Sequence, residues 1–155
     1  MRHFFDTADI LRFLNSKAFY VGATFDSCQL SKFIKESIWE YGYYDSDHTS
    51  IKTEKYEEYV ADIAKGDTLI VKRLNGKAQT TMRILAIGIV LGRNFDKTIR
   101  VAWVRQLDLD VPLHTVGTIS PGYRLTELPE TIKKEVDKAR AKFLRLNLQI
   151  EDQWY

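Results

Sequence analysis

Hydrophobic residues recur at helical spacing near both ends of the chain and alternate at strand spacing in its middle. A first helix is expected over residues 7–15, with Asp6 as its N-cap. A last amphipathic helix is expected over residues 129–146. The expected buried positions are Ile10, Leu11, Phe13 and Leu14 in the first helix and Ile132, Val136, Ala139, Phe143 and Leu146 in the last.

Between these helices the first third of the chain predicts a strand followed by two further helices. The strand is expected over residues 18–25, and Asp26 with Ser27 is expected to cap a helix that ends near Gly42. The third helix is expected over residues 53–64. The inward positions are expected to be Leu30, Phe33, Ile34 and Ile38 in the second helix and Tyr56, Tyr59, Val60 and Ile63 in the third.

The middle of the chain predicts a sheet. Strands over residues 67–74 and 80–91 flank Asn75-Gly76, a dipeptide typical of hairpin turns. Further strands are expected over 98–107, where apolar and polar residues alternate, and over 122–128. The sum is an α+β fold with a small, curled, mostly antiparallel β-sheet or barrel and surrounding helices. We expect one domain over 1–155, with a helical extension at 1–17 and a C-terminal helix and tail at 129–155.

Composition narrows the class of protein without assigning it a function. A chain of 155 residues that is 45% hydrophobic and 28% charged fits one folded domain. The formal net charge of +2 is too small to indicate nucleic acid by itself. A lone cysteine, Cys28, and apolar runs far shorter than the roughly 20 residues of a membrane span predict a cytoplasmic protein with no membrane partner.

The segment after the second helix carries the most informative chemistry. Trp39, Tyr41, Tyr43 and Tyr44 gather around Gly42 at an expected element boundary. Aromatic side chains in such a place can form the walls of a slot for a flat ligand, and an unstacked nucleobase is a common ligand of this kind. Core packing is the competing interpretation for the tryptophan, because buried tryptophans are common.

Five motifs in order over residues 18–107 resemble the EVE-like domains of the PUA superfamily, found at the N-terminus of McrB-type modification-dependent restriction proteins. YTH readers of 6-methyladenine are more distantly similar, and their Ser-Ile-Trp tryptophan forms a wall of an aromatic cage. The motifs are Tyr20-Val21-Gly22-Ala23, Ile38-Trp39-Glu40-Tyr41-Gly42-Tyr43, Ile63-Ala64-Lys65-Gly66-Asp67, Ile84-Leu85-Ala86-Ile87-Gly88-Ile89-Val90 and Ile99-Arg100-Val101-Ala102-Trp103.

The resemblance implies a pocket that accepts a modified base flipped out of DNA. Trp39 matches the cage position, and Trp103 is a candidate second wall. The remaining pocket candidates stand at the end of the first strand or around the aromatic cluster: Phe25, Thr24, Asp26, Tyr41 and Tyr43. Helix capping is the competing role for Asp26. The resemblance also implies a partner, a fused or separate nucleoside-triphosphate-driven restriction motor with a nuclease.

Basic residues concentrate in the strand-rich region and are candidates for contacts with the nucleic-acid backbone. Solvated strand edges explain any one of them equally well. The candidates are Lys72, Arg73, Lys77, Arg83, Arg93, Arg100 and Arg105.

Nothing in the sequence predicts an enzyme, a metal site or a cofactor. His3, His48 and His114 are scattered, and no Cys/His metal spacing, phosphate-binding glycine loop or nucleophile motif is present. Three alternatives remain: an RNA-binding PUA-like domain, a protein-interaction domain that docks a partner through its aromatic cluster, and an amidohydrolase. The last, implied by some small PUA-like domains, would use Lys72 or Lys35 with Glu36 or Glu40.

Overall fold

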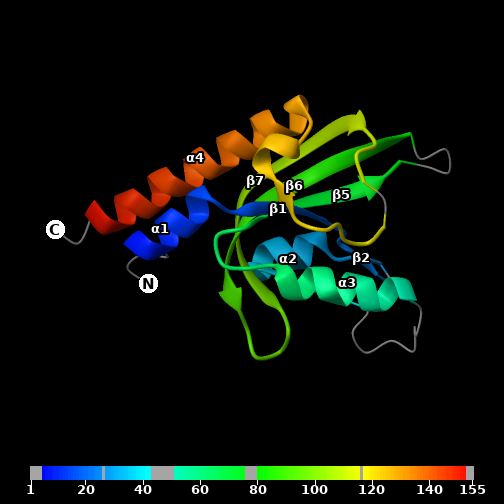
Figure 1. Ribbon diagram of the computed structural model, residues 1–155, viewed down its shortest axis with the longest axis horizontal. Helices are drawn as coiled ribbons and strands as arrows, with labels where there is room; N and C mark the ends of the chain where they lie inside the picture. The colour runs from blue at the N-terminus through cyan, green and yellow to red at the C-terminus, as the bar shows by residue number, and fades with distance from the viewer. Residues whose placement is uncertain (1–4, 26, 43–50, 76–79, 116, 153–155) are drawn as a thin grey trace.

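The computed structural model describes residues 5–25, 27–42, 51–75, 80–115 and 117–152, of which 25, 27, 51–54 and 148–152 are described in backbone alone. The elements in chain order are α1 (Thr7–Leu14), β1 (Lys17–Val21), β2 (Thr24–Phe25), β3 (Ser27–Cys28), α2 (Leu30–Glu36), β4 (Ile38–Trp39), α3 (Ile51–Asp62), β5 (Thr68–Leu74), β6 (Thr81–Arg93), β7 (Ile99–Pro112), β8 (Tyr123–Arg124), a 3-10 turn (Leu125–Glu127) and α4 (Glu130–Asp152). The α+β class is confirmed (Figure 1).

Six strands form one sheet in the order β4-β7-β6-β5-β1-β8, and β2 with β3 forms a separate two-stranded sheet. Every neighbouring pair in the large sheet is antiparallel except β1 and β5, which run parallel from Ala18↔Thr68 to Val21↔Val71. The mostly antiparallel sheet is therefore confirmed. It is open rather than closed into a barrel, because β4 and β8 end it as edge strands in the described part of the chain.

Helices cover both faces of the sheet, and each face has its own core (Figure 1). On one face α4 packs against α1 and the residues just before it, with Phe143 against Phe5 at 5.0 Å and against Phe13 of α1 at 5.6 Å between ring centroids. On the other face α2 and α3 pack on the sheet through Phe33 and Val60, both fully buried. In Figure 1 α4 runs past the edge of the sheet, and α1 lies beside its protruding half.

The predictions for α1 and α4 are right in position and partly wrong in which side chains are buried. Asp6 caps α1 as expected, in a capping box with Asp9. Leu11 and Leu14, however, are 60% and 58% exposed, and Leu146 is 41% exposed. The core of α1 and α4 is built on phenylalanine rings that meet each other, so the leucines at the margins of each stripe remain in solvent.

The second helix differs most from its prediction. It begins at Leu30 with Gln29 as N-cap and not at Asp26, which lies outside the described residues. It ends at Glu36, with Ser37 as a C-cap in the left-handed conformation (φ 57°), and not near Gly42. The chain then turns into β4, so Trp39 belongs to a short edge strand and not to a helix exit.

Gly88 provides a test of how tightly the sheet packs. A methyl group on Gly88 would overlap Val101 and lie 2.7 Å from Trp103 Cε3. Gly88→Ala should therefore lower the free energy of unfolding by about 1–3 kcal/mol, as overpacking does. Gly22→Ala is the matched control, since among the described residues its new methyl meets only Thr118 O, at 3.4 Å. Urea denaturation of both variants measures the difference, and equal stabilities would contradict the packing described here.

Candidate functional site

The carboxyl ends of β1 and β5 lie side by side because these two strands are the parallel pair of the sheet. The chain leaves β1 through Gly22, while a register shift between Val71 and Lys72 marks an irregularity in β5. Such irregularities change the direction in which a strand presents its side chains. The two strand ends and the residues beyond them form the floor and one wall of a cavity.

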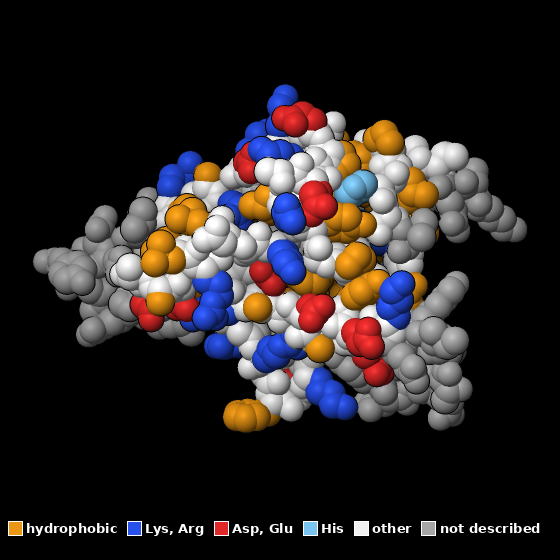
Figure 2. Space-filling model, viewed as in Figure 1, with side chains coloured by type: hydrophobic (Ala, Val, Ile, Leu, Met, Phe, Trp, Pro, Cys, Tyr) orange, Lys and Arg blue, Asp and Glu red, His pale blue; other side chains and the backbone are white. Residues whose placement is uncertain are grey.

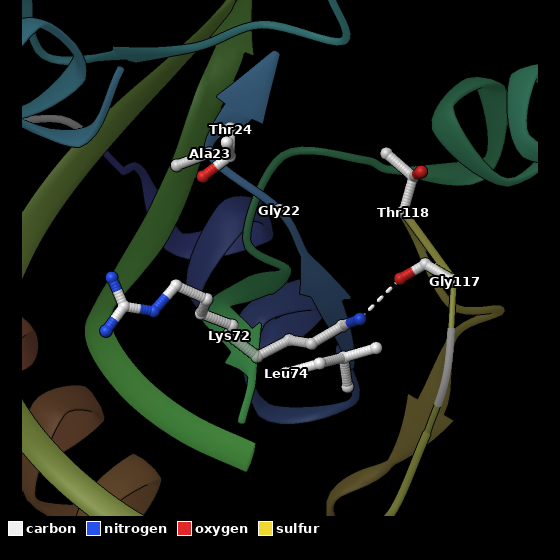
Figure 3. Close-up of a pocket in the computed structure, with 8 residues that line it drawn as sticks. Gly22, Ala23, Thr24, Lys72, Leu74, Gly117 and Thr118 are labelled. Carbon is white, nitrogen blue, oxygen red and sulfur yellow. Dashed lines mark hydrogen bonds between the residues drawn. The ribbon is translucent and has the colours of Figure 1, made fainter. Parts of the chain in front are cut away.

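The opposite wall comes from the segment between β7 and β8. Gly22 N donates a hydrogen bond to Thr118 O at 2.9 Å, and Val21 pairs with Ile119 in an antiparallel bridge. Gly117 has a positive φ of 91°, a conformation that favours glycine, and a methyl group there would overlap the Tyr56 hydroxyl of α3. Its carbonyl faces the end of β5 across the cavity (Figure 3).

The cavity has a volume of about 360 Å³, near the lower end of the roughly 300–1,000 Å³ typical of small-ligand sites. Its described lining combines small residues, hydroxyl groups and two cations, with no acidic side chain. The lining residues are Gly22, Ala23, Thr24, Lys72, Arg73, Leu74, Gly117 and Thr118.

Lys72 is the most unusual group in this cavity. The side chain reaches across the opening, and its ammonium donates a hydrogen bond to Gly117 O (Figure 3). Only 6% of the residue is exposed, and burial lowers the pKa of Lys72 to about 8. In the described part of the chain no carboxylate forms an ion pair with it. A cation that is desolvated and bound only to a neutral carbonyl is suited to receive an anion.

Trp39 does not line an open slot, and this prediction is corrected. The residue is 1% exposed and packs in the core beneath α2 and α3. Its indole Nε1 donates a hydrogen bond to Gly22 O at 2.8 Å. The ring therefore does not line the cavity itself. It fixes the backbone of Gly22, which does line it.

The other aromatic candidates divide in the same way. Tyr41 is 2% exposed and belongs to the same core as Trp39, so it is not a wall of an open pocket either. Trp103 is half-buried, and its Nε1 donates to Ile38 O at 3.0 Å, which ties β7 to β4. Phe25 is described in backbone alone, and Tyr43 lies outside the described residues.

The polar pocket candidates and the basic candidates also have different positions. Thr24, Lys72 and Arg73 meet at the cavity, and Arg100 is exposed on β7. Arg83 is ion-paired with Asp108, Arg105 with Glu135, and Arg93 donates to Val60 O and Ile63 O at the end of α3. Lys77 and Asp26 lie outside the described residues.

The basic side chains do not form a continuous patch in the view of Figure 2. There the basic and acidic side chains of the described residues are interspersed. The groups proposed for the amidohydrolase reading are not assembled either: Lys72 lines the cavity, whereas Lys35, Glu36 and Glu40 are not among its lining residues. Over the described residues no group of three or more His, Cys, Asp or Glu side chains is placed to hold a metal ion.

Sequence reasoning missed the cavity segment around Gly117. The run Gly117-Thr118-Ile119-Ser120-Pro121-Gly122 has two glycines and a proline, a signal for a tightly turning backbone. Its partner across the cavity is set by a contact between residues 45 positions apart in the chain. No local pattern specifies such a contact.

Comparisons with known proteins assign no family to the chain, because no family model, curated protein or solved structure matches it. The kinship with EVE-like domains therefore stays a prediction. None of the described helices combines the length and the apolar character that crossing a membrane requires.

Trp39→Ala should reduce the stability of the domain rather than remove one contact with a ligand. Deleting a fully enclosed tryptophan side chain leaves a large void, so we expect a loss of about 3–5 kcal/mol in the free energy of unfolding. Leu14→Ala, at an exposed position of α1, should change stability by less than about 0.5 kcal/mol. Urea denaturation gives both values. Parent-like stability of Trp39→Ala would show that the ring is open to solvent.

Lys72 should make stability depend on pH in a way that Lys72→Met removes. The unfolded chain binds a proton on this lysine up to its ordinary pKa of 10.5, whereas the folded chain binds it only up to about 8. The unfolded state thus holds more protons between these values, and the parent gains stability from Lys72 as pH rises through them. Below about pH 8 the burial penalty is fully present.

The stability of Lys72→Met relative to the parent should therefore fall by about 1–2 kcal/mol between about pH 8 and about pH 10. Lys72→Met lacks the hydrogen bond to Gly117 O at every pH, so the pH dependence of stability, rather than its value at one pH, is the decisive measurement. Lys142→Met, at an exposed position of α4, is the matched control. Chemical denaturation across this range tests the expectation, and parallel curves for parent and Lys72→Met would contradict it.

Proposed function

We propose that this chain is a non-catalytic nucleic-acid-binding domain that holds one nucleotide, extruded from duplex DNA, in the Lys72 cavity. The observation that carries the proposal is the Lys72 ammonium, which is largely buried, has no carboxylate partner in the described part of the chain, and faces an open cavity. A phosphate would supply the charge that this site lacks.

The rest of the lining suits a nucleotide. Arg73 adds a second cation to the lining. The glycines have no side chain, so a ligand can approach the protein backbone closely there. Ala23 and Leu74 offer apolar surface, and the hydroxyls of Thr24 and Thr118 can donate or accept hydrogen bonds at a base edge. Extrusion of a base costs a few kcal/mol, which favours duplexes whose base is already weakly stacked or modified.

The finer parts of the proposal rest on the resemblance to EVE-like domains. These are a modified base as the preferred target, a PUA-type relationship, and a restriction motor and nuclease as partners. We propose binding without catalysis because the described lining holds no carboxylate, imidazole or thiol that could act together with Lys72 in proton transfer.

A binding panel of short duplexes tests the proposal. The duplexes carry 5-methylcytosine, 5-hydroxymethylcytosine, 6-methyladenine or no modification, and fluorescence anisotropy gives the affinity at low and moderate salt. We expect one modified duplex to bind best and Lys72→Met to weaken its binding by at least about tenfold, since a hydrogen bond to a charged group contributes about 1.5–3 kcal/mol. Lys142→Met should bind as the parent does, apart from a small uniform charge effect.

The pH dependence of binding gives a second readout on the same duplexes. The charged form of Lys72 is the one that binds an anion, so affinity should decline as pH rises through about 8, and Lys72→Met should lack this decline. Preference for RNA that disappears when the 2′-hydroxyls are removed would favour an RNA-binding domain instead. No affinity for any nucleic acid, with salt-insensitive binding to a protein partner, would favour the protein-interaction alternative.

A further inference from the structure

Phe95 stands at the tip of the hairpin that joins β6 to β7, and its side chain is fully exposed, at 111% of the reference value. Figure 1 shows this hairpin projecting beyond the rest of the sheet at the lower edge of the molecule. A single exposed apolar residue is common on protein surfaces and by itself indicates nothing. At Phe95 three further features are present: the hairpin projects, hydrogen bonds hold its loop, and the loop carries charged residues.

The loop beneath Phe95 is held by a set of hydrogen bonds. Asn94 N donates to Thr98 O at 2.9 Å, and Asn94 Nδ2 donates to Thr98 Oγ1 at 2.8 Å. Asp96 Oδ1 accepts from Thr98 N at 3.1 Å and from Thr98 Oγ1 at 2.5 Å. The aromatic side chain is thus presented on an ordered tip, which lowers the entropy lost when it binds a partner.

The charged residues of the loop itself are mainly basic. Arg93, Lys97 and Arg100 flank it in the sequence, and Asp96 is the single acid between them, although Arg93 is bound to the α3 carbonyls. The Asp96 carboxylate is turned to Thr98, whose hydroxyl and backbone N–H hold its pKa below the usual range. An aromatic ring flanked by cations matches duplex DNA, in which stacked bases lie between two phosphate backbones. It fits a lipid surface poorly, because one ring among Asn94 and Asp96 offers little area to hydrocarbon.

We propose that the β6–β7 hairpin is a wedge that inserts Phe95 between stacked base pairs of a DNA duplex while Lys97 and Arg100 contact phosphates. This inference rests on the proposed function, since it takes the partner to be duplex DNA. The major groove of a duplex admits a two-stranded ribbon, and apolar side chains of other DNA-binding proteins unstack base steps by insertion.

The wedge is a contact separate from the Lys72 cavity. Lys72 pairs with Ile84 near the start of β6, and the hairpin loop follows Arg93, nine residues further along that strand. At about 3.3 Å per residue this is roughly 30 Å along the strand. Phe95 therefore does not fill the space left by a nucleotide held in the cavity, but unstacks a different base step of the same duplex.

The experiment uses the full chain and short unmodified and 5-methylcytosine duplexes that carry 2-aminopurine, whose fluorescence rises when it is unstacked. We expect parent protein to raise the fluorescence at one base step. Phe95→Ala should abolish the rise and weaken duplex binding by about fivefold to one-hundredfold, as truncation of a stacked aromatic residue does. Phe95→Trp should retain both properties, because a larger ring stacks as well.

Two controls separate the possible outcomes. Leu14→Ala removes another exposed apolar side chain, on α1, and should bind as the parent does. Parent-like binding of Phe95→Ala, together with weakened binding of Lys72→Met, would overturn the wedge and leave the proposed function standing. Lost affinity without any fluorescence change in the parent complex would also overturn insertion. A parent protein that binds neither these duplexes nor any duplex of the modification panel would remove the proposed function and the wedge together.

Discussion

The parallel pairing of β1 with β5 is the constraint on which the candidate site depends. Among the neighbouring strands that the structure describes, the other pairs are antiparallel, and only this pair brings two carboxyl strand ends together. Parallel neighbours require a long crossover, and residues 22–67 supply one that includes α2, β4 and α3. The register ends at Val21↔Val71, so the next residues, Gly22 and Lys72, meet at the cavity. Ligands bind at such carboxyl ends in many open sheets that contain parallel strands.

Several segments are held in place around that junction by hydrogen bonds rather than by apolar contact alone. The indole Nε1 of Trp39 donates a hydrogen bond to Gly22 O, and Gly22 N donates one to Thr118 O. At the opposite end of the pair, the buried Asp67 carboxylate accepts from Lys17 N at 3.0 Å and from Ala64 N at 2.8 Å. These contacts fix the start and the end of the crossover, and the cavity walls follow from them.

The elements that sequence reasoning located well are those with long periodic patterns. The helices α1 and α4 and the strands β6 and β7 repeat their hydrophobic spacing over enough residues to be recognised. β4 has only two residues and continues a helical pattern, so its local sequence favours the wrong structure. It is a strand because its backbone pairs with β7 at Ile38↔Arg100 and Trp39↔Ile99, which no local pattern shows.

The site was predictable only in part for a related reason. The aromatic cluster around residue 39 has the composition of a ligand cage, but composition does not tell an enclosed ring from an exposed one. Thr24, Lys72 and Arg73 were recognised as candidates by residue type, yet their assembly depends on strand order and on the distant Gly117. Three of the basic candidates have other partners. Arg83 and Arg105 are paired with carboxylates, and Arg93 donates to a backbone carbonyl at the end of α3.

Lys72 links the stability of the free domain to the nature of its ligand. Burial of an ammonium against a single carbonyl destabilises the folded state at neutral pH, and a fold without a use for this charge gains by replacing it with an apolar side chain. An anion bound in the cavity would reverse the balance, because it would stabilise the charged form and bind only the folded chain. The ammonium that destabilises the empty site is thus the group through which a phosphate would stabilise the occupied one, and this favours the proposed negatively charged ligand over a neutral ring.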